Sequence, residues 1–253
     1  MHKAQSIQLS FFAPEAQKIR ADVLFSQAFG QDADLVQSNR TPSPEAPFFS
    51  LAVGSTDNID SRVQVQPGRI DLIVAPKEGA AGDSIPLFDV KDNLARVRRS
   101  LSNINVEDEK ISRVAVLVQL MRIFHTLPEV TAFLLDQADI KIDLSGVSDF
   151  NMQLNRRRRL ESWGNHEMNR LVTLTENIFQ RVQLQFAAPN SGPRPVGINY
   201  FGGGVLVDIN SAPGHEFIPA GSVARVAEEI MAEMTRFTSS SKPMTLLRET
   251  NVD

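Results

Sequence analysis

Alternation of apolar and polar residues constrains this chain to a sheet-rich fold more than any other feature of its sequence. Residues 149–187 carry two such runs, one that leads into Arg156 and one that follows Trp163. A period of two is typical of a half-buried β-strand, because successive side chains point to opposite faces of a sheet. With a turn at 163–165, this segment predicts a long pair of antiparallel strands, and we expect the rest of the chain to be organised around it.

Shorter runs predict the other strands. Residues 113–124 form the most apolar run and carry apolar side chains on both faces, so we expect a central strand that is covered on both sides. A hairpin is expected where Pro67 and Gly68 separate two alternating runs. The glycine run 202–204 is expected to form a turn or a bulge before the last strand. Further strands are expected at residues 7–11, 48–53 and 205–209.

Apolar stripes with spacings of three and four residues predict helices. The clearest begins at Asp89, a typical N-cap residue, and its stripe consists of Val90, Leu94, Val97, Leu101 and Ile104. Thr126 and Glu129 have the spacing of a capping box and predict the start of another helix. The remaining helices are expected at residues 15–29 and 222–237.

A charged break at residues 105–110 separates two parts with the same expected order: a strand, a helix, several antiparallel strands and a second helix. The sequence therefore predicts an α+β protein with two similar halves, in which antiparallel sheets carry helices packed on their faces. We assign residues 1–110 to the N-terminal half and residues 111–238 to the C-terminal half. Residues 239–253 are largely polar and are expected to form a loose tail.

Composition excludes several classes of protein. The chain has 253 residues and no cysteine, which excludes disulfides, thiolate metal sites and a cysteine nucleophile. No apolar stretch approaches the roughly 20 residues of a membrane span, and no signal-peptide core is present, so we expect a cytoplasmic protein that does not bind a membrane. The formal net charge of −4 argues against general phosphate binding, which normally requires a basic protein.

Several short motifs resemble a known family. They are Leu206-Val207-Asp208-Ile209-Asn210 before the closing helix, Arg69-Ile70-Asp71-Leu72 in the first half, and the strand 113–124 that runs into Leu127-Pro128-Glu129. In this order they resemble a sporadically distributed, uncharacterised family of bacterial α+β proteins of similar length. The resemblance implies a two-part antiparallel α+β fold and supplies no activity or catalytic residues. This chain has Asn210 where such proteins usually carry a second acid.

Four consecutive arginines form the only arginine run in the chain. In a strand, Arg156 and Arg158 would share one face, and Arg157 and Arg159 would share the other. One interpretation is a solvated hairpin end with surface salt bridges. Another is a site for the acidic surface of a protein partner, because guanidinium groups hold carboxylates through paired hydrogen bonds. A third is a site for nucleic acid.

Trp163 and His166 flank the turn beyond the arginine run. An exposed tryptophan beside arginines would be a recognition anchor. A lone tryptophan is more often packed, with its indole N–H bonded to a carbonyl, and we favour that interpretation. The predicted partner-binding site contains Arg156, Arg157, Arg158, Arg159, Trp163 and His166.

No metal site, cofactor or catalytic group is expected. The histidines at positions 2, 125, 166 and 215 lack metal-binding spacing, and the glycine run precedes a strand, whereas a phosphate loop opens a helix. Asp208 and His215 could meet only through tertiary folding. The sequence therefore predicts a non-catalytic protein-interaction or scaffold subunit of a bacterial assembly that binds through its arginine-rich ribbon, with a homodimer as one arrangement. The alternatives are a nucleic-acid-associated protein and an enzyme whose site is assembled from distant residues.

Overall fold

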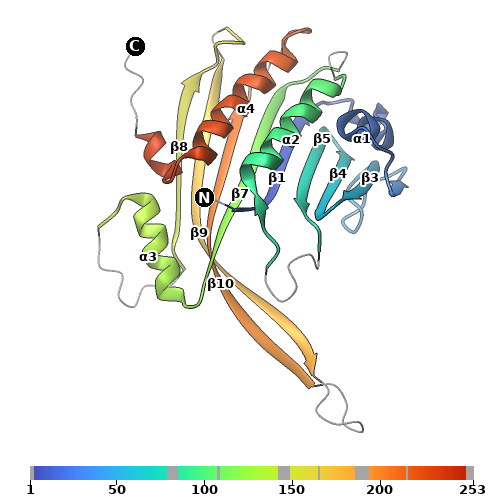
Figure 1. Ribbon diagram of the computed structural model, residues 1–253. Coiled ribbons are helices and arrows are strands. Elements are labelled where there is room, and N and C mark those ends of the chain that lie inside the picture. Colours follow the sequence, from blue (N-terminus) through green and yellow to red (C-terminus); the bar gives the residue numbers. More distant parts are fainter. Residues whose placement is uncertain are drawn as a thin grey trace.

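The protein is an α+β protein in which helices pack on an antiparallel sheet, as the sequence predicted (Figure 1). Each described strand pair is antiparallel. The computed structural model describes residues 3–78, 85–106, 109–141, 149–164, 166–185, 194–214 and 216–248.

The strands of both halves of the chain join in one sheet. They are β1 (Lys3–Phe12), β2 (Leu35–Ser38), β3 (Ser50–Thr56), β4 (Ile59–Gln66), β5 (Arg69–Pro76), β6 (Phe88–Asp89), β7 (Arg113–Phe124), β8 (Asn151–Arg159), β9 (Glu167–Gln185) and β10 (Arg194–Ser211). Their order across the sheet is β2-β3-β4-β5-β1-β7-β10-β9-β8, and the short β6 pairs with β1. Among the described strands, β2 and β8 therefore lie at the two edges of the sheet.

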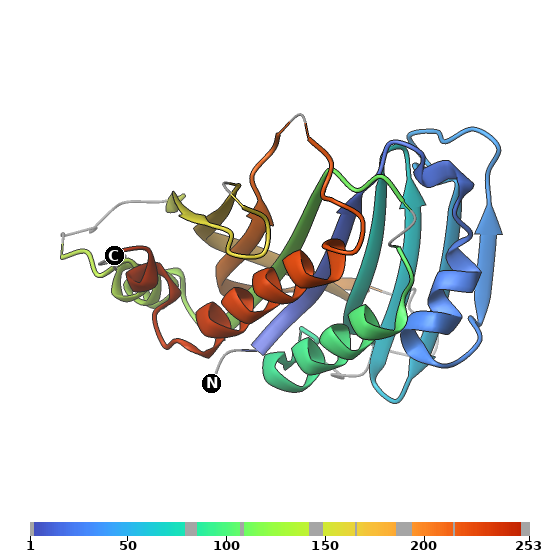
Figure 2. The same cartoon turned by 90° about the horizontal axis from the view of Figure 1, so that it is seen from above.

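The helices lie on one face of this sheet, and the opposite face carries none of the described helices (Figure 2). Helices α1, α2 and α4 run side by side across that face, and α3 lies over the part formed by β9 and β10. The helices are α1 (Ala21–Phe29), α2 (Val90–Asn103), α3 (Leu127–Ala138) and α4 (Val223–Ser239), with the short 3₁₀ helices η1 (Ala16–Lys18) and η2 (Pro243–Leu247).

The strand expected to be central, β7, lies between β1 and β10. On its helix-covered face, Val114, Val116, Val118 and Leu120 belong to the hydrophobic core. The other face, which was also expected to be covered, is covered only in part and carries none of the described helices, as an antiparallel sheet allows. On that second face the small side chain of Ala115 is buried by its neighbours, while Leu117 stays partly exposed.

The two halves are similar in topology. In sheet order, β3-β4-β5-β1 of the first half corresponds to β8-β9-β10-β7 of the second. The first strands of the two halves, β1 and β7, therefore pair with each other at the centre of the sheet. There Leu9 faces Val116 and Phe11 faces Val114. Helices α2 and α4, the last helix of each half, contact each other over this junction. One continuous core therefore lies under both halves.

Local signals in the sequence set the ends of several elements. Asp89 caps α2 by accepting hydrogen bonds from the backbone N–H groups of Lys91 and Asp92. Thr126 and Glu129 form the capping box of α3. Gly30 ends α1 in the left-handed conformation, with φ at 67°, which glycine adopts without a Cβ clash.

The segment 15–29 does not form one continuous helix. It divides into η1 and α1, because Ile19 and Arg20 adopt extended backbone angles between them. This break buries both Ala16 and Ala21, and Ser50 on β3 accepts a hydrogen bond from the Ala21 backbone N–H. An apolar stripe alone does not show such a break, because the pattern continues across it.

Part of the tail that the sequence predicted to be loose is packed. Helix η2 buries Met244 and Leu247, and it contacts α3, β8, β9 and α4. Arg248 donates hydrogen bonds to the Asp139 carboxylate and to the Ala138 carbonyl at the end of α3. A single 3₁₀ turn is too short to leave a periodic signal in the sequence.

The glycine run 202–204 forms neither a turn nor a bulge. All three glycines lie within β10 and pair in continuous register with β7 and β9. A Cβ atom on Gly203 would lie 2.5 Å from the Phe133 ring on α3. This glycine therefore allows α3 to approach the sheet closely.

Strands β9 and β10 continue beyond the sheet as a two-stranded ribbon, which projects from the body in Figure 1. Pairing between β10 and β7 stops at Phe201, and pairing between β9 and β8 stops at Thr175, whereas β9 and β10 pair with each other as far as Gln185 and Arg194. In the described part of the chain, none of the helices has the length and apolar character needed to cross a membrane.

Candidate functional site

The arginine run lies on β8, the last strand of the sheet at the C-terminal half. Among the described residues, β8 pairs with β9 alone, so its other edge is not paired within the sheet. Most of its side chains are exposed, including the apolar Leu154. The predicted alternation divides the arginines between the two faces of the sheet, and the contacts of each pair follow that division.

Arg156 and Arg158 face the helices. The Arg156 guanidinium donates a hydrogen bond of 2.8 Å to the Leu247 carbonyl of η2. Arg158 donates to Glu233 on α4 and to Glu161 in the turn after β8, both at 3.3 Å. These two arginines therefore connect the edge strand β8 to α4 and η2 through hydrogen bonds and an ion pair.

Glu233 is the centre of this contact. The residue is buried, with 5% of its surface exposed, and it lies within 3.3 Å of the guanidinium groups of Arg158, Arg170 and Arg236. Burial alone would raise the pKa of the Glu233 carboxyl, but the hydrogen bond and charge of Arg236, followed by Arg170 and Arg158, outweigh it and hold that pKa below its ordinary value. The carboxylate is therefore ionised at neutral pH.

Arg170 on β9 is almost completely buried, with 1% of its surface exposed. Burial lowers its pKa below the ordinary arginine value, and the hydrogen bond and charge of Glu233 oppose that effect. Its Nε atom also donates to the Arg156 carbonyl at 3.3 Å. Arg170, Glu233 and Arg236 form part of the cluster and were not identified from the sequence, because the Arg170–Glu233 contact joins residues 63 positions apart.

Arg157 and Arg159 point to the opposite face, which carries no described helix. Arg157 forms an ion pair of 3.1 Å with Glu167 on β9, and both side chains are about half exposed. The Arg159 Nε atom donates to the Gly164 carbonyl in the turn. Exposed pairs of this kind contribute little to stability, because water and salt screen them and long side chains lose entropy when held. These two guanidinium groups are the ones that a partner could reach.

The turn between β8 and β9 contains the two remaining predicted residues. Trp163 is buried and its ring stacks on the His166 ring, with the ring centres 3.7 Å apart. His166 Nε2 lies 3.5 Å from Glu216. Glu229 on α4 accepts hydrogen bonds from the backbone N–H groups of Glu161 and Ser162. The turn is thus packed against α4, and Trp163 takes the packed alternative.

A second polar cluster lies on the sheet face that carries no described helix. The carboxylate of Asp71 is buried and accepts hydrogen bonds from Ser10, Gln8, Gln66 and Arg69. All of these partners lie on strands β1, β4 and β5, so this carboxylate is held by its own sheet.

In the second half, β10, the strand that corresponds to β5 in sheet order, also carries an acid, which is partly buried. Asp208 accepts a hydrogen bond from Asn210 at 2.7 Å, and Asn210 in turn accepts one from Asn169. Burial raises the pKa of the Asp208 carboxyl above its ordinary value. His215, considered from the sequence as a possible neighbour of Asp208, lies outside the described residues. In the part of the chain that the structure describes, no group of three histidine, aspartate or glutamate side chains could hold a metal ion.

Comparison with known proteins gives no match to a family model, a curated protein or a solved structure. The resemblance to an uncharacterised bacterial family therefore stays a prediction. The candidate site is the β8 edge, with Arg157 and Arg159 displayed and Arg156 and Arg158 held against the helices.

Proposed function

We propose that the protein is a non-catalytic protein-interaction subunit of a cytoplasmic bacterial assembly, and that it binds an extended acidic segment of a partner protein along β8. The observation that carries this proposal is that β8 ends the sheet with one long edge unpaired among the described residues and displays arginines there. An open edge provides backbone N–H and C=O groups to which an extended segment can add as a further strand.

Arg157 and Arg159, on the face of β8 that carries no described helix, make the edge selective for an acidic partner. Among the acidic side chains of the described residues, only the exposed Glu167 forms an ion pair with Arg157. A carboxylate on a partner strand can replace Glu167 in this pair, because exposed ion pairs are weak. The chain as a whole has a formal net charge of −4. An acidic partner is therefore attracted at this edge and repelled by the molecule in general, which favours one docking position.

Peptide binding tests the proposal. The probe is a fluorescent twelve-residue peptide of alternating Glu and Val, and its matched control replaces each Glu with Lys. We expect the acidic peptide to bind, and Arg157→Gln with Arg159→Gln to weaken binding by about 3- to 30-fold, as two exposed charge pairs allow. Fluorescence anisotropy at low and moderate salt measures the affinity.

A matched double variant, Arg96→Gln with Arg99→Gln on α2, changes the net charge equally but leaves β8 intact and should bind as the wild type does. Equal binding of the acidic and basic peptides, or equal losses in both double variants, would show that β8 does not select an acidic segment.

A single-stranded oligonucleotide is added as a third probe. If it binds more tightly than the acidic peptide and loses affinity steeply with salt, the nucleic-acid alternative is favoured.

The same edge also fits β8 of a second copy. Antiparallel pairing centred on Asn155 would place Arg157 opposite Gln153 and Arg159 opposite Asn151, so that arginines would not face each other. The homodimer would extend the sheet across both molecules. Sedimentation equilibrium with and without the acidic peptide tests for this homodimer. A dimer that pairs through β8 should dissociate to monomers when the peptide occupies the edge.

A further inference from the structure

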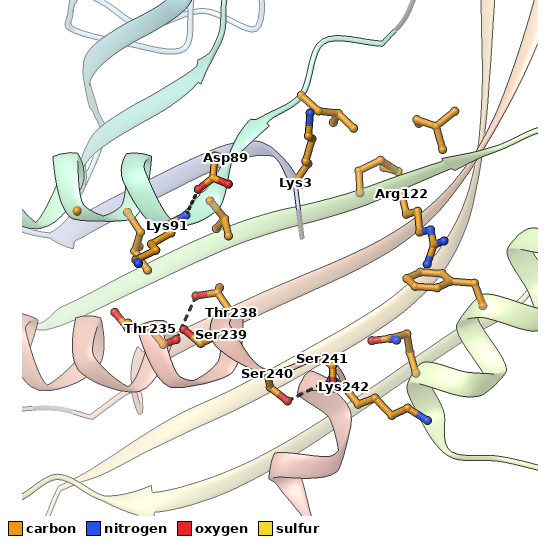
Figure 3. Close-up of a pocket in the computed structure, with 18 of the residues that line it drawn as sticks. Lys3, Asp89, Lys91, Arg122, Thr235, Thr238, Ser239, Ser240, Ser241 and Lys242 are labelled. Carbon is orange, nitrogen blue, oxygen red and sulfur yellow. Dashed lines mark hydrogen bonds between the residues drawn. The ribbon is translucent and has the colours of Figure 1, made fainter. Parts of the chain in front are cut away.

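A large cleft lies on the helix side of the sheet, between the start of α2, the end of α4, helix α3 and the end of β7 (Figure 3). Its volume is about 1110 Å³. Small-molecule sites typically occupy about 300–1,000 Å³, so this space can hold a compound of ordinary ligand size. The described residues that line it do not include β8, and the cleft is thus separate from the proposed docking edge.

One part of the cleft wall is apolar. Helix α2 contributes Leu94 and Ala95, helix α3 contributes Phe133, and Met121 and Ile123 of β7 complete this part of the wall. The Arg122 guanidinium lies over the Phe133 ring, 5.7 Å from its centre, so a positive charge borders this apolar surface. A ligand that binds here meets both kinds of surface within a short distance.

The remaining wall is rich in positive charge. The lining residues include five basic side chains and two acidic ones: Lys3, Lys91, Arg98, Arg122 and Lys242, with Asp89 and Asp136. The cleft therefore has an excess of three positive charges in a chain whose net charge is −4. This reversal of sign favours an anionic ligand, since a wall of one charge raises the local concentration of the opposite ion.

Part of that charge has a partner already. Lys242 pairs with Asp136, and Arg98 pairs with a glutamate on α4 outside the cleft. The Asp89 carboxylate is used as the N-cap of α2. Within the described ranges, Lys3, Lys91 and Arg122 have no carboxylate within salt-bridge distance, and Figure 3 shows them around the space that the cleft encloses.

Gln137 supplies an independent indication of a ligand. This residue on α3 lines the cleft and is 4% exposed, and its buried Oε1 atom has no hydrogen-bond partner among the described residues. A buried acceptor without a donor costs free energy, so a ligand donor that reached this oxygen from the cleft would be stabilising.

We propose that this cleft binds a small amphipathic anion: an acyl or aryl group that carries a carboxylate or phosphate, with a hydroxyl or amide donor for Gln137. The apolar body packs on Leu94 and Phe133. The anionic group lies near Arg122, and Lys91, at the other end of the cleft in Figure 3, adds to its positive charge; neither side chain has a salt-bridge partner within the described residues.

Isothermal titration calorimetry of the full chain tests the proposal with four probes below their micelle concentrations: decanoate, decyl phosphate, decyltrimethylammonium and inorganic phosphate. Binding of decanoate or decyl phosphate, with no binding of the cationic probe, is the expected result. Equal binding of the cationic and anionic probes would overturn the proposal. Binding to phosphatidylglycerol vesicles without binding of either free anion would also overturn it, in favour of a membrane surface.

Variants locate the site. Arg122→Gln with Lys91→Gln should weaken decanoate binding about tenfold, because charged hydrogen bonds are lost. Ala95→Trp, at an exposed position of the cleft wall, should block it. The matched control, Arg96→Gln with Arg99→Gln, removes the same charge from α2 outside the cleft and should leave binding unchanged. Equal losses in both double variants would overturn the assignment to this cleft.

A final comparison tests Gln137. In the wild type, 3-hydroxydecanoate should bind at least about threefold more tightly than decanoate, because its hydroxyl can donate to Oε1. In Gln137→Leu this difference should vanish, while thermal unfolding should show a fold at least as stable as the wild type, since the orphan oxygen is removed. Equal affinities in the wild type would overturn the role given to Gln137.

Discussion

Glu233 shows how one residue can fix an edge strand. Its carboxylate joins Arg158 on β8, Arg170 on β9 and Arg236 on α4, and it therefore connects two strands with the helix that covers them. Arg170 depends on this contact most, because a guanidinium with 1% exposure has little water to replace a lost carboxylate.

At this scale we expect Glu233→Gln to destabilise the protein strongly. The change leaves Arg170 buried without a counter-charge, and the loss of one partner of a buried pair typically costs about 3–5 kcal/mol. Urea unfolding followed by circular dichroism measures the free energy. The control, Arg236→Gln, removes a guanidinium that is 38% exposed and should cost about 1 kcal/mol or less. Equal costs for the two variants would contradict the central place of Arg170.

The difference in the free energy of unfolding between the wild type and Glu233→Gln should depend on pH, and its direction follows from the pKa of Glu233. The pKa of Glu233 is lower in the folded protein than its ordinary value of 4.5. Such a group stabilises the fold at pH values above its unfolded pKa, and this contribution is lost as the pH falls through the folded pKa. The stability gap between wild type and Glu233→Gln should therefore be largest at neutral pH and shrink below about pH 4.5. Asp208, whose pKa is raised, is present in both proteins and cancels in the comparison.

At the scale of elements, the distance of α3 from the sheet is set by Gly203 of β10. A Cβ atom at Gly203 would lie 2.5 Å from the Phe133 ring on α3, whereas one at the neighbouring Gly202 would lie 2.6 Å from the Met121 sulfur atom on β7. Helix α3 also has its own local start in the capping box of Thr126 and Glu129. The cap therefore decides where the helix begins, and Gly203 decides how closely it packs.

We expect Gly203→Ala to destabilise the protein by about 1–3 kcal/mol, the usual cost of overpacking. Removal of the opposing ring in the double variant Gly203→Ala with Phe133→Ala should cost less than the sum of the two single changes, because the added methyl group fills part of the space. A double-mutant cycle from urea unfolding measures this coupling. Purely additive costs would show that the two residues do not press against each other.

At the scale of the whole molecule, the two halves form one sheet because β1 and β7 pair at the centre. Val116 lies at this junction, opposite Leu9 of the first half and opposite Ile209 of its own half, and all three are fully buried. Helices α2 and α4 pack across the same line. This arrangement favours a single cooperative unit over two independent domains.

We expect Val116→Ala to lower the free energy of unfolding by about 1–3 kcal/mol through the cavity that it leaves. Hydrogen exchange should then accelerate by a similar factor in β4 of the first half and β9 of the second, because both depend on the same global opening. Val23→Ala, at a half-exposed position of α1, is the control and should change little. Acceleration confined to the second half would indicate that the halves open separately.

Much of the fold was predictable because its signals are local. Strand alternation, the Asp89 cap and the capping box at Thr126 each depend on residues within a few positions of one another. The division of the arginines between two faces of β8 followed from the same period of two. Predicted site residues therefore lie together on one strand and its turn.

Tertiary structure alone decided which of those side chains are available. Arg158 and Arg170 meet Glu233 across 75 and 63 residues, and no local pattern encodes a contact over such separations. The same holds for the packing of Trp163 and for the close approach of α3 to Gly203. By itself the sequence determined the longer strands, the starts of α2 and α3 and the faces on which the arginines of β8 lie, since these depend on backbone geometry and neighbouring residues. The single sheet, the buried arginine cluster and the amphipathic cleft were decided only when distant strands and helices packed together, because burial and charge pairing depend on which segments meet.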